Sequence, residues 1–156
     1  MKTDKFLLAI IIAIVLLVVI AVVLVLTRNQ TEAYVADDSP AGVVHDYFLA
    51  IQRKDFERAY RYLSNEIASK PDLDEFIRTM NNYQTETALQ IGESTITDNR
   101  ARVEVLITTY SGGDLFSSGS YTNHDTAYLK LNSEGKWQLT QFPYPYWGYN
   151  WNEAKK

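Results

Sequence analysis

The apolar positions of the chain follow three patterns, one after another. Residues 6–26 (FLLAIIIAIVLLVVIAVVLVL) are apolar throughout and contain no glycine, proline or polar side chain. From about Pro40 to Met80, apolar residues recur every three or four positions, which predicts amphipathic helices. After about Thr85 the period changes to two, which predicts strands. Helices followed by strands are the order of an α+β protein, here placed behind an apolar N-terminal segment.

The apolar N-terminal segment is long enough to span a membrane. At about 1.5 Å rise per residue, a helix over residues 6–26 covers roughly 30 Å, the thickness of a bilayer's hydrocarbon core. A cleaved signal peptide has a shorter apolar region with small residues directly after it, whereas Thr27 and Arg28 follow here. A buried soluble helix would need a core that surrounds all its faces. We therefore expect a retained transmembrane helix; a cleaved signal and a buried helix are the alternatives.

The charges that flank this segment indicate its orientation. Lys2 and Lys5 precede it, whereas Arg28 is the single basic residue directly after it. The positive-inside rule then predicts a single-pass protein of the cell membrane, with a cytoplasmic N-terminus and an extracytoplasmic C-terminal domain. Ala9 and Ala13 match a weak small-residue packing pattern, so a homodimer is an alternative to an ordinary lipid-facing span.

Three helices are predicted after the anchor, each beginning at a capping residue. Ser39 is a favoured N-cap, and Pro40 is tolerated at the first helical position. Asp55 is the expected cap of the second helix. Asp72, with Glu75 three residues later, resembles a capping box at the start of the third. The apolar faces of the three helices comprise Val43, Val44, Tyr47, Phe48 and Ile51, then Phe56, Ala59, Tyr60 and Leu63, then Leu73, Phe76, Ile77 and Met80.

Four strands are predicted after the helices. Gly92 interrupts the first of them and indicates a bulge. The glycine- and serine-rich loop Ser111–Ser120 separates the second strand from the third, and we expect it to be mobile. Residues Asn132–Gly135 form a short hairpin loop before the last strand. The expected strands are residues 89–96, Ala101–Tyr110, Tyr121–Leu131 and Lys136–Phe142.

Two groups of residues carry a resemblance to a known superfamily. They are Val44, Tyr47, Ala50, Ile51, Asp55, Phe56, Ala59, Tyr60, Leu63 and Ser64 in the first two helices, and Tyr128, Leu129, Lys130, Leu131, Gly135, Lys136 and Trp137 in the last hairpin. Together with the element order, residues 39–142 resemble small bacterial extracytoplasmic members of the nuclear-transport-factor-2-like superfamily. The resemblance implies a cone of three helices packed into a strongly curved antiparallel sheet, often with a pocket. The superfamily includes isomerases, dehydratases, transport adaptors and domains without known activity, so this fold does not determine the function.

Composition removes several classes of function. The net charge is −4, and residues 1–28, with three basic side chains against one acidic, carry +2, so the remainder carries −6. An acidic domain is unsuited to binding nucleic acid. There is no cysteine, which excludes disulfides and thiol chemistry. Since His45 and His124 are the two histidines, we expect no multi-histidine metal site and no cofactor.

A candidate acid–base site lies in the third predicted strand. Tyr121, His124, Asp125 and Tyr128 could serve as proton donors and acceptors in a pocket. Adjacent side chains of a strand point to opposite faces, however, so Tyr128 shares the face of His124 while Tyr121 shares that of Asp125. A polar surface patch is the reading we favour over catalysis.

The C-terminal run QFPYPYWGYNWNEAKK is the most unusual feature outside the anchor. Its prolines and glycine disfavour regular structure. Either the tail folds back over the domain and buries its rings, or it exposes an aromatic platform that binds a glycan, a protein partner or the membrane interface. The candidate binding residues are Tyr144, Tyr146, Trp147, Tyr149 and Trp151.

A basic strip lies on and before the second predicted helix and comprises Arg53, Lys54, Arg58 and Arg61. Acidic residues are interleaved with it, so a solvated helix face is the default interpretation. Binding of an acidic partner is the alternative.

These observations predict a membrane-anchored extracytoplasmic domain that binds a small ligand or an envelope protein or glycan, without catalysis. The alternative is a small cofactor-independent dehydratase or isomerase acting in the cone pocket. The expected organisation is a cytoplasmic N-terminus, a transmembrane helix, a tether, the α+β domain and an aromatic tail, at residues 1–5, 6–27, 28–38, 39–142 and 143–156.

Overall fold

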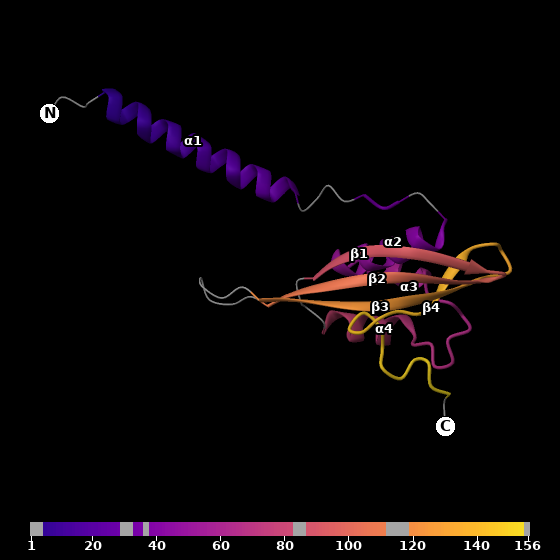
Figure 1. The fold of residues 1–156 in the computed structure, drawn as a ribbon. Coiled ribbons are helices and arrows are strands. Elements are labelled where there is room, and N and C mark those ends of the chain that lie inside the picture. Colours follow the sequence, from indigo (N-terminus) through magenta and orange to yellow (C-terminus); the bar gives the residue numbers. More distant parts are fainter. Residues whose placement is uncertain (1–4, 29–32, 36–37, 83–86, 112–118, 155–156) are drawn as a thin grey trace. The chain divides into compact units, whose positions relative to one another are not determined.

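A computed structural model of the chain describes residues 5–28, 33–35, 38–82, 87–111 and 119–154 (Figure 1). Contacts divide the chain into two units, Met1–Ala33 and Tyr34–Lys156.

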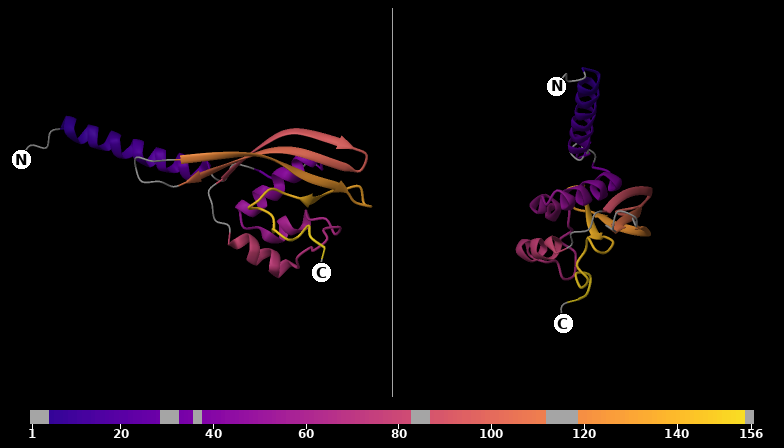
Figure 2. Two further views of the ribbon diagram at one scale, coloured as in Figure 1. Left: turned by 60° about the horizontal axis from the view of Figure 1, so that its bottom comes forward. Right: turned by 90° about the vertical axis from the view of Figure 1, so that its left-hand side faces the viewer.

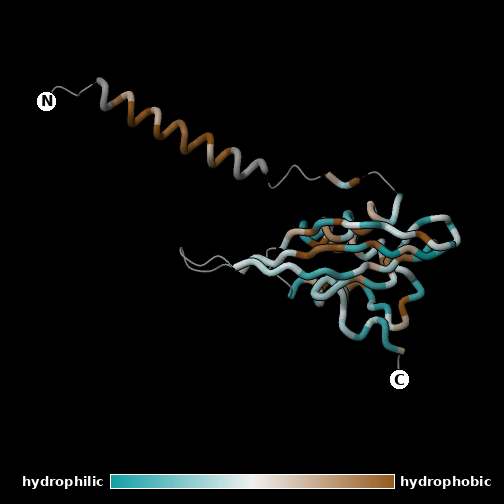
Figure 3. The backbone as a smooth tube through the Cα atoms, viewed as in Figure 1, coloured by the Kyte–Doolittle hydropathy of each residue, from teal (hydrophilic) through white to brown (hydrophobic). Residues whose placement is uncertain are grey.

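The first unit contains one helix, α1, over Lys5–Arg28. Its described side chains, residues 8–23, are all exposed and apolar (Figure 3). Among the residues that the structure describes, no helix has both the length and the apolarity that crossing a membrane requires. The membrane span therefore stays a prediction from the sequence.

The second unit begins with three helices, as the sequence predicts. In each, the side-chain oxygen of the expected cap accepts a hydrogen bond from the backbone N–H three residues further on, at 3.1 Å for Ser39, 3.3 Å for Asp55 and 2.8 Å for Asp72. These bonds satisfy N–H groups that have no partner inside the helix, and they determine where each helix begins. The helices are α2 (Pro40–Gln52), α3 (Phe56–Arg61) and α4 (Leu73–Asn81).

Four antiparallel strands follow in the spatial order β1-β2-β3-β4, so the α+β prediction is confirmed. The register shifts between Ile91 and Ser94, which places the predicted bulge at Gly92. A side chain there would bring its Cβ to 3.1 Å from the Cβ of Glu104 on the neighbouring strand. Most of the loop Ser111–Ser120 lies outside the described residues. The strands are β1 (Thr87–Thr97), β2 (Arg100–Ser111), β3 (Gly119–Leu131) and β4 (Trp137–Gln141).

The three helices cover one face of the sheet and leave the other face open (Figure 2). The alternation of β2 shows the difference, because Val103 and Val105 are buried under the helices while Arg102 and Glu104 are exposed on the open face. Leu63, two residues after the end of α3, forms a parallel bridge with Leu139 of β4. This bridge fixes the loop after α3 against the edge of the sheet.

The C-terminal tail folds back over the helices, which was the first of the two alternatives for it. The Trp151 ring packs on Phe76 of α4 with the ring centroids 5.7 Å apart. The Tyr47 hydroxyl of α2 donates a hydrogen bond to the carbonyl of Tyr146 at 2.6 Å. The backbone N–H of Ser69 donates to the carbonyl of Trp151 at 2.8 Å. The tail is therefore part of the core and not an appendage of it.

Candidate functional site

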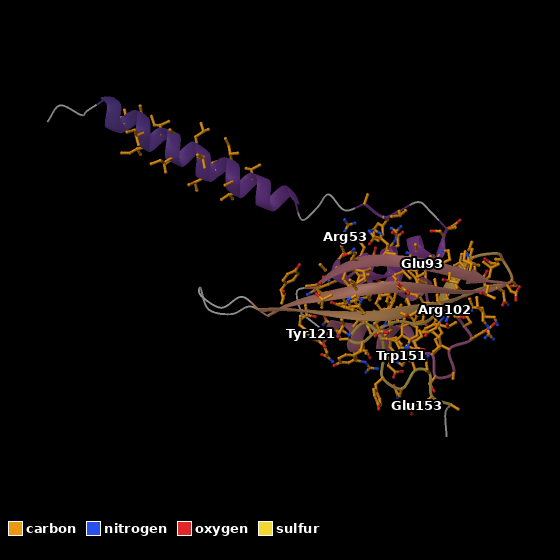
Figure 4. The ribbon with its side chains drawn as sticks, viewed as in Figure 1. Arg53, Glu93, Arg102, Tyr121, Trp151 and Glu153 are labelled. Carbon is orange, nitrogen blue, oxygen red and sulfur yellow. The ribbon has the colours of Figure 1, made fainter. Side chains whose placement is uncertain are left out.

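The candidate acid–base residues do not meet in one place. Asp125 lies opposite the buried Val105, so Asp125 and Tyr121 face the helix-covered side of the sheet. His124 and Tyr128 face the open side, and all four side chains are exposed. Tyr121 lies towards one end of the sheet (Figure 4). Tyr128 pairs with Arg102, and Arg102 lies towards the other end. Separated by the sheet and open to water, these groups form no enclosed acid–base pair.

The candidate aromatic residues of the tail divide into two groups. Tyr146, Trp147 and Trp151 are 2%, 6% and 2% exposed, so their rings are unavailable for stacking with a partner. Tyr144 and Tyr149 are 67% and 90% exposed. The five residues therefore do not form one continuous platform, because three of the five rings lie in the core.

A groove of about 550 Å³ lies between α3 and the hairpin that joins β3 to β4. Helix α3 and its C-terminal turn contribute Arg58, Arg61 and Tyr62, and the hairpin contributes Trp137 and Gln138. Two arginines of the basic strip and Tyr62 thus line one wall, and the Trp137 ring and the Gln138 amide line the other. The carboxylates of Asp38 and Glu134 also line this concave surface. Small-ligand sites commonly combine such apolar surface with a few polar groups.

The hairpin wall of this groove is held in place by its own hydrogen bonds. The Asn132 side-chain oxygen accepts from the backbone N–H groups of Glu134 and Lys136, both at 2.9 Å. Gly135 has a φ of 75°, a conformation that glycine adopts without the steric cost of a Cβ. The side chains of Lys136 and Glu134 form an ion pair at 3.4 Å. The two charges of the hairpin tip therefore compensate each other.

Two donors of the groove are open to a ligand. The Trp137 indole is half-buried, and its N–H has no hydrogen-bond acceptor among the described residues. The exposed Arg61 guanidinium likewise has no carboxylate or carbonyl partner there. Because an indole N–H and a guanidinium can only donate, an acceptor-rich ligand suits both.

Arg58, by contrast, lines the groove and contacts neighbouring side chains that orient it. Its hydrogen bond with the Tyr62 hydroxyl raises the pKa of Arg58 above the ordinary value for a guanidinium. Burial raises the pKa of Tyr62, and the nearby Arg58 partly opposes that effect. The Tyr62 hydroxyl in turn donates to a side-chain oxygen of Asp46 at 3.3 Å. Arg58 is therefore a permanently charged donor whose orientation is set by neighbouring side chains.

Asp46 is a site residue that the sequence reasoning missed. It is 5% exposed, and its Oδ1 accepts a hydrogen bond from the backbone N–H of Val35 at 2.8 Å. The Nδ1 of His45 lies 3.0 Å from the same oxygen. The sequence did contain a signal, because apolar residues surround Asp46 on nearly every side of its helix, and a carboxylate among them must be buried and hydrogen-bonded.

A second groove, of about 580 Å³, lies across the open face of the sheet. Arg100, Arg102, Tyr128 and Lys130 line it, and Glu66 neutralises Lys130 through an ion pair. Its exposed arginines can attract an anion. It lacks a half-buried aromatic ring such as Trp137, so the groove beside α3 has the more complete set of binding groups.

Comparisons with known proteins support the fold alone. No known family matches the sequence, and no curated protein matches it. A SEC-C motif containing protein from Rhodopseudomonas palustris is similar in structure, with a TM-score of 0.53 at 18% identity, over 72% of this chain and 80% of that protein. A SEC-C motif containing protein from Psychrobacter arcticus has a TM-score of 0.52 at 16% identity, over 72% of this chain and 63% of that one. A ketosteroid isomerase-like protein from Shewanella frigidimarina NCIMB 400 has a TM-score of 0.49 at 18% identity, over 69% of this chain and 96% of that protein.

Proposed function

We propose that this chain is a single-pass, membrane-anchored extracytoplasmic module with a nuclear-transport-factor-2-like cone, and that it binds a small acidic ligand without catalysis. The apolar run at residues 6–26, with lysines before it and an acidic domain after it, supports the anchor and its orientation. The order of three helices and four antiparallel strands supports the cone. The observation that carries the binding function is the groove beside α3, where Trp137 faces two arginines.

The groups of that groove favour a ligand with an acidic substituent and a flat face. Arg58 and Arg61 can donate paired N–H groups to a carboxylate, a geometry that suits guanidinium. Trp137 and Tyr62 offer apolar ring surface beside them, and Gln138 offers an amide for hydroxyl groups. A sugar acid combines a carboxylate, hydroxyl groups and a flat apolar ring face, so it is the ligand class we propose.

The alternative function, a dehydratase or isomerase that uses Tyr121, His124, Asp125 or Tyr128, has the strand register against it. A general acid and a general base must both reach the same substrate. In this sheet His124 and Asp125 face opposite sides, and neither lines either of the two grooves described above. No contact among the described residues favours catalysis over binding.

Calorimetric titration of the full chain in detergent micelles with glucuronate tests the binding function, with glucose as the uncharged counterpart. We expect glucuronate to bind more tightly than glucose, and Arg61→Gln to weaken glucuronate binding about tenfold, which corresponds to one charge-assisted hydrogen bond of roughly 1.5 kcal/mol. Arg78→Gln is the matched control, because Arg78 is an exposed helix arginine outside the groove. Equal binding of the two sugars, or an unchanged affinity of Arg61→Gln, would contradict the proposal.

Protease treatment of intact cells tests the orientation separately. If the domain is extracytoplasmic, an added protease should remove it from intact cells while the N-terminal segment is retained in the membrane. Cleavage confined to broken cells would overturn the extracytoplasmic assignment and leave the binding experiment unaffected.

A further inference from the structure

Two residues before the first helix of the domain lie against its surface. The Tyr34 ring packs under the guanidinium of Arg58, with the central carbon of that group 3.5 Å from the ring centroid. Arg53 approaches the same ring at 5.0 Å. The Tyr34 hydroxyl donates to a side-chain oxygen of Asp55 at 3.4 Å. A segment that the sequence alone reads as tether is therefore held between charged groups of α3 and the turn before it.

The neighbouring residue Val35 is held by a hydrogen bond to a buried charge. Its backbone N–H donates to Oδ1 of Asp46 at 2.8 Å, and Asp46 is 5% exposed. A buried carboxylate without enough donors is costly. Val35 therefore contributes one of the donors that Asp46 requires, and the Tyr62 hydroxyl contributes another at 3.3 Å.

We propose that Tyr34 and Val35 form a strap that docks in cis on α2 and α3, and that Arg58 couples this docking to occupancy of the groove beside α3. The docking surface is an interaction site for an extended Tyr-Val segment, and the tether of the same chain occupies it. The coupling rests on the proposed function, whereas the docking does not.

Arg58 can serve the strap and a ligand at once because the two use different parts of its guanidinium. Tyr34 contacts the flat face of the group. A carboxylate would accept from the N–H donors, which lie in the plane of the group. The stack therefore orients Arg58 without occupying its donors. One donor bonds to the Tyr62 hydroxyl, and a guanidinium has further N–H groups that a ligand can use. The coupling is positive: a docked strap strengthens ligand binding. Thermodynamic reciprocity then requires that a bound ligand also strengthens docking of the strap.

Docking also determines how much chain is left between α1 and the domain. From the end of α1 at Arg28 to Tyr34, the fully extended chain reaches about 20 Å. Release of the strap would lengthen this connection by the residues up to the N-cap of α2 at Ser39. A ligand that stabilises docking would thus shorten the reach of the domain.

Hydrogen exchange of the Val35 amide in the full chain, in detergent micelles without ligand, tests the docking. We expect this amide to exchange at least tenfold more slowly than an unprotected amide, and Tyr34→Ala to abolish most of the protection. Tyr34→Phe keeps the ring under Arg58 and should retain the protection. Tyr149→Ala, at a 90% exposed ring, is the control for loss of a tyrosine elsewhere. Exchange of Val35 at the unprotected rate in the unaltered chain would overturn the docking, whatever the groove binds.

Titration of the same variants with glucuronate tests the coupling. We expect Tyr34→Ala to weaken binding three- to tenfold, Tyr34→Phe and Tyr149→Ala to leave it unchanged, and glucuronate to slow the exchange of Val35 in the unaltered chain. Unchanged affinity of Tyr34→Ala would overturn the coupling. Failure of the unaltered chain to bind glucuronate would overturn the proposed function and the coupling with it. The exchange rate of the Val35 amide would still show whether the strap docks.

Discussion

Two aromatic regions of the domain contain the same residue types and differ in what their polar atoms contact. In the tail, the Trp147 indole N–H donates to Asn152 at 2.9 Å, and the Tyr146 hydroxyl is hydrogen-bonded to Thr87. In the groove beside α3, the Trp137 indole N–H has no acceptor among the described residues, and the ring is half-buried. In the tail, the polar atoms of the buried Trp147 and Tyr146 are thus paired within the chain, whereas the groove has donors that a ligand can use.

This difference indicates how an aromatic cluster can be assigned to structure or to binding. A core cluster buries its rings and pairs their polar atoms internally, because an unpaired buried donor is costly. A binding cluster leaves ring surface and donors accessible. Substitutions in the two regions should therefore have different effects. Those in the tail should lower the stability of the domain, and those in the groove should lower the affinity for the ligand.

The largest effect is expected from Trp151→Ala. The ring is 2% exposed and packs on both Phe76 and Trp147, with centroid distances of 5.7 and 5.1 Å. Removing it should lower the free energy of unfolding by about 3–5 kcal/mol, measured by urea denaturation. Tyr149→Ala, two residues earlier and exposed, should change it by less than about 0.5 kcal/mol. Equal effects of the two substitutions would show that the tail does not belong to the core.

A smaller loss is expected from Gly148→Ala. A Cβ at this position would lie 2.2 Å from ring atoms of Trp151, so the buried indole would have to move. Overpacking of this kind should destabilise the domain by about 1–3 kcal/mol. A thermal unfolding temperature equal to that of the unaltered chain would show that the ring is less tightly held than the contact implies.

The smallest of the three effects, and the one that depends on pH, is expected from Tyr47→Phe. Loss of the hydroxyl leaves the Tyr146 carbonyl without its donor and should cost about 1–2 kcal/mol at neutral pH. Burial raises the pKa of Tyr47 well above its ordinary value. The unfolded chain releases that proton near pH 10, as free tyrosine does, while the folded chain retains it. Stability should therefore fall as the pH rises above about 10.

Tyr47→Phe should make that alkaline decline less steep, as measured by urea denaturation at a series of pH values. It should not remove the decline, because burial also raises the pKa of Tyr146. An equally steep decline in the variant would show that ionisation of Tyr47 does not contribute to alkaline unfolding.

The periodicity of the sequence predicted the elements of the domain closely. Ser39, Asp55 and Asp72 cap the helices as expected, because an N-cap bond joins residues only three positions apart. The alternation of β3 assigned its side chains to the correct faces, since this follows from strand geometry alone. The bulge at Gly92 was likewise visible, because a glycine interrupts the period there.

The groove and the strap were not predictable in this way. Arg58 and Trp137 are 79 positions apart in the sequence, and they face each other because Leu63 bridges to Leu139 beside them. Tyr34 lies in a segment without any apolar period, so no local rule predicted that it would pack under Arg58. Such contacts depend on how elements distant in the chain come together.

The sequence by itself determined the local features of this protein: a long apolar N-terminal segment, three capped helices, four strands and an acidic, cysteine-free domain. Each depends on residues close together in the chain, where backbone geometry sets the spacing. Only the tertiary structure decided which aromatic residues became core and which remained open. That decision depends on whether a residue distant in the chain covers a ring or pairs its polar atom, as Phe76 covers Trp151 and Thr87 bonds the Tyr146 hydroxyl in the tail, and as no described residue does for the Trp137 indole N–H.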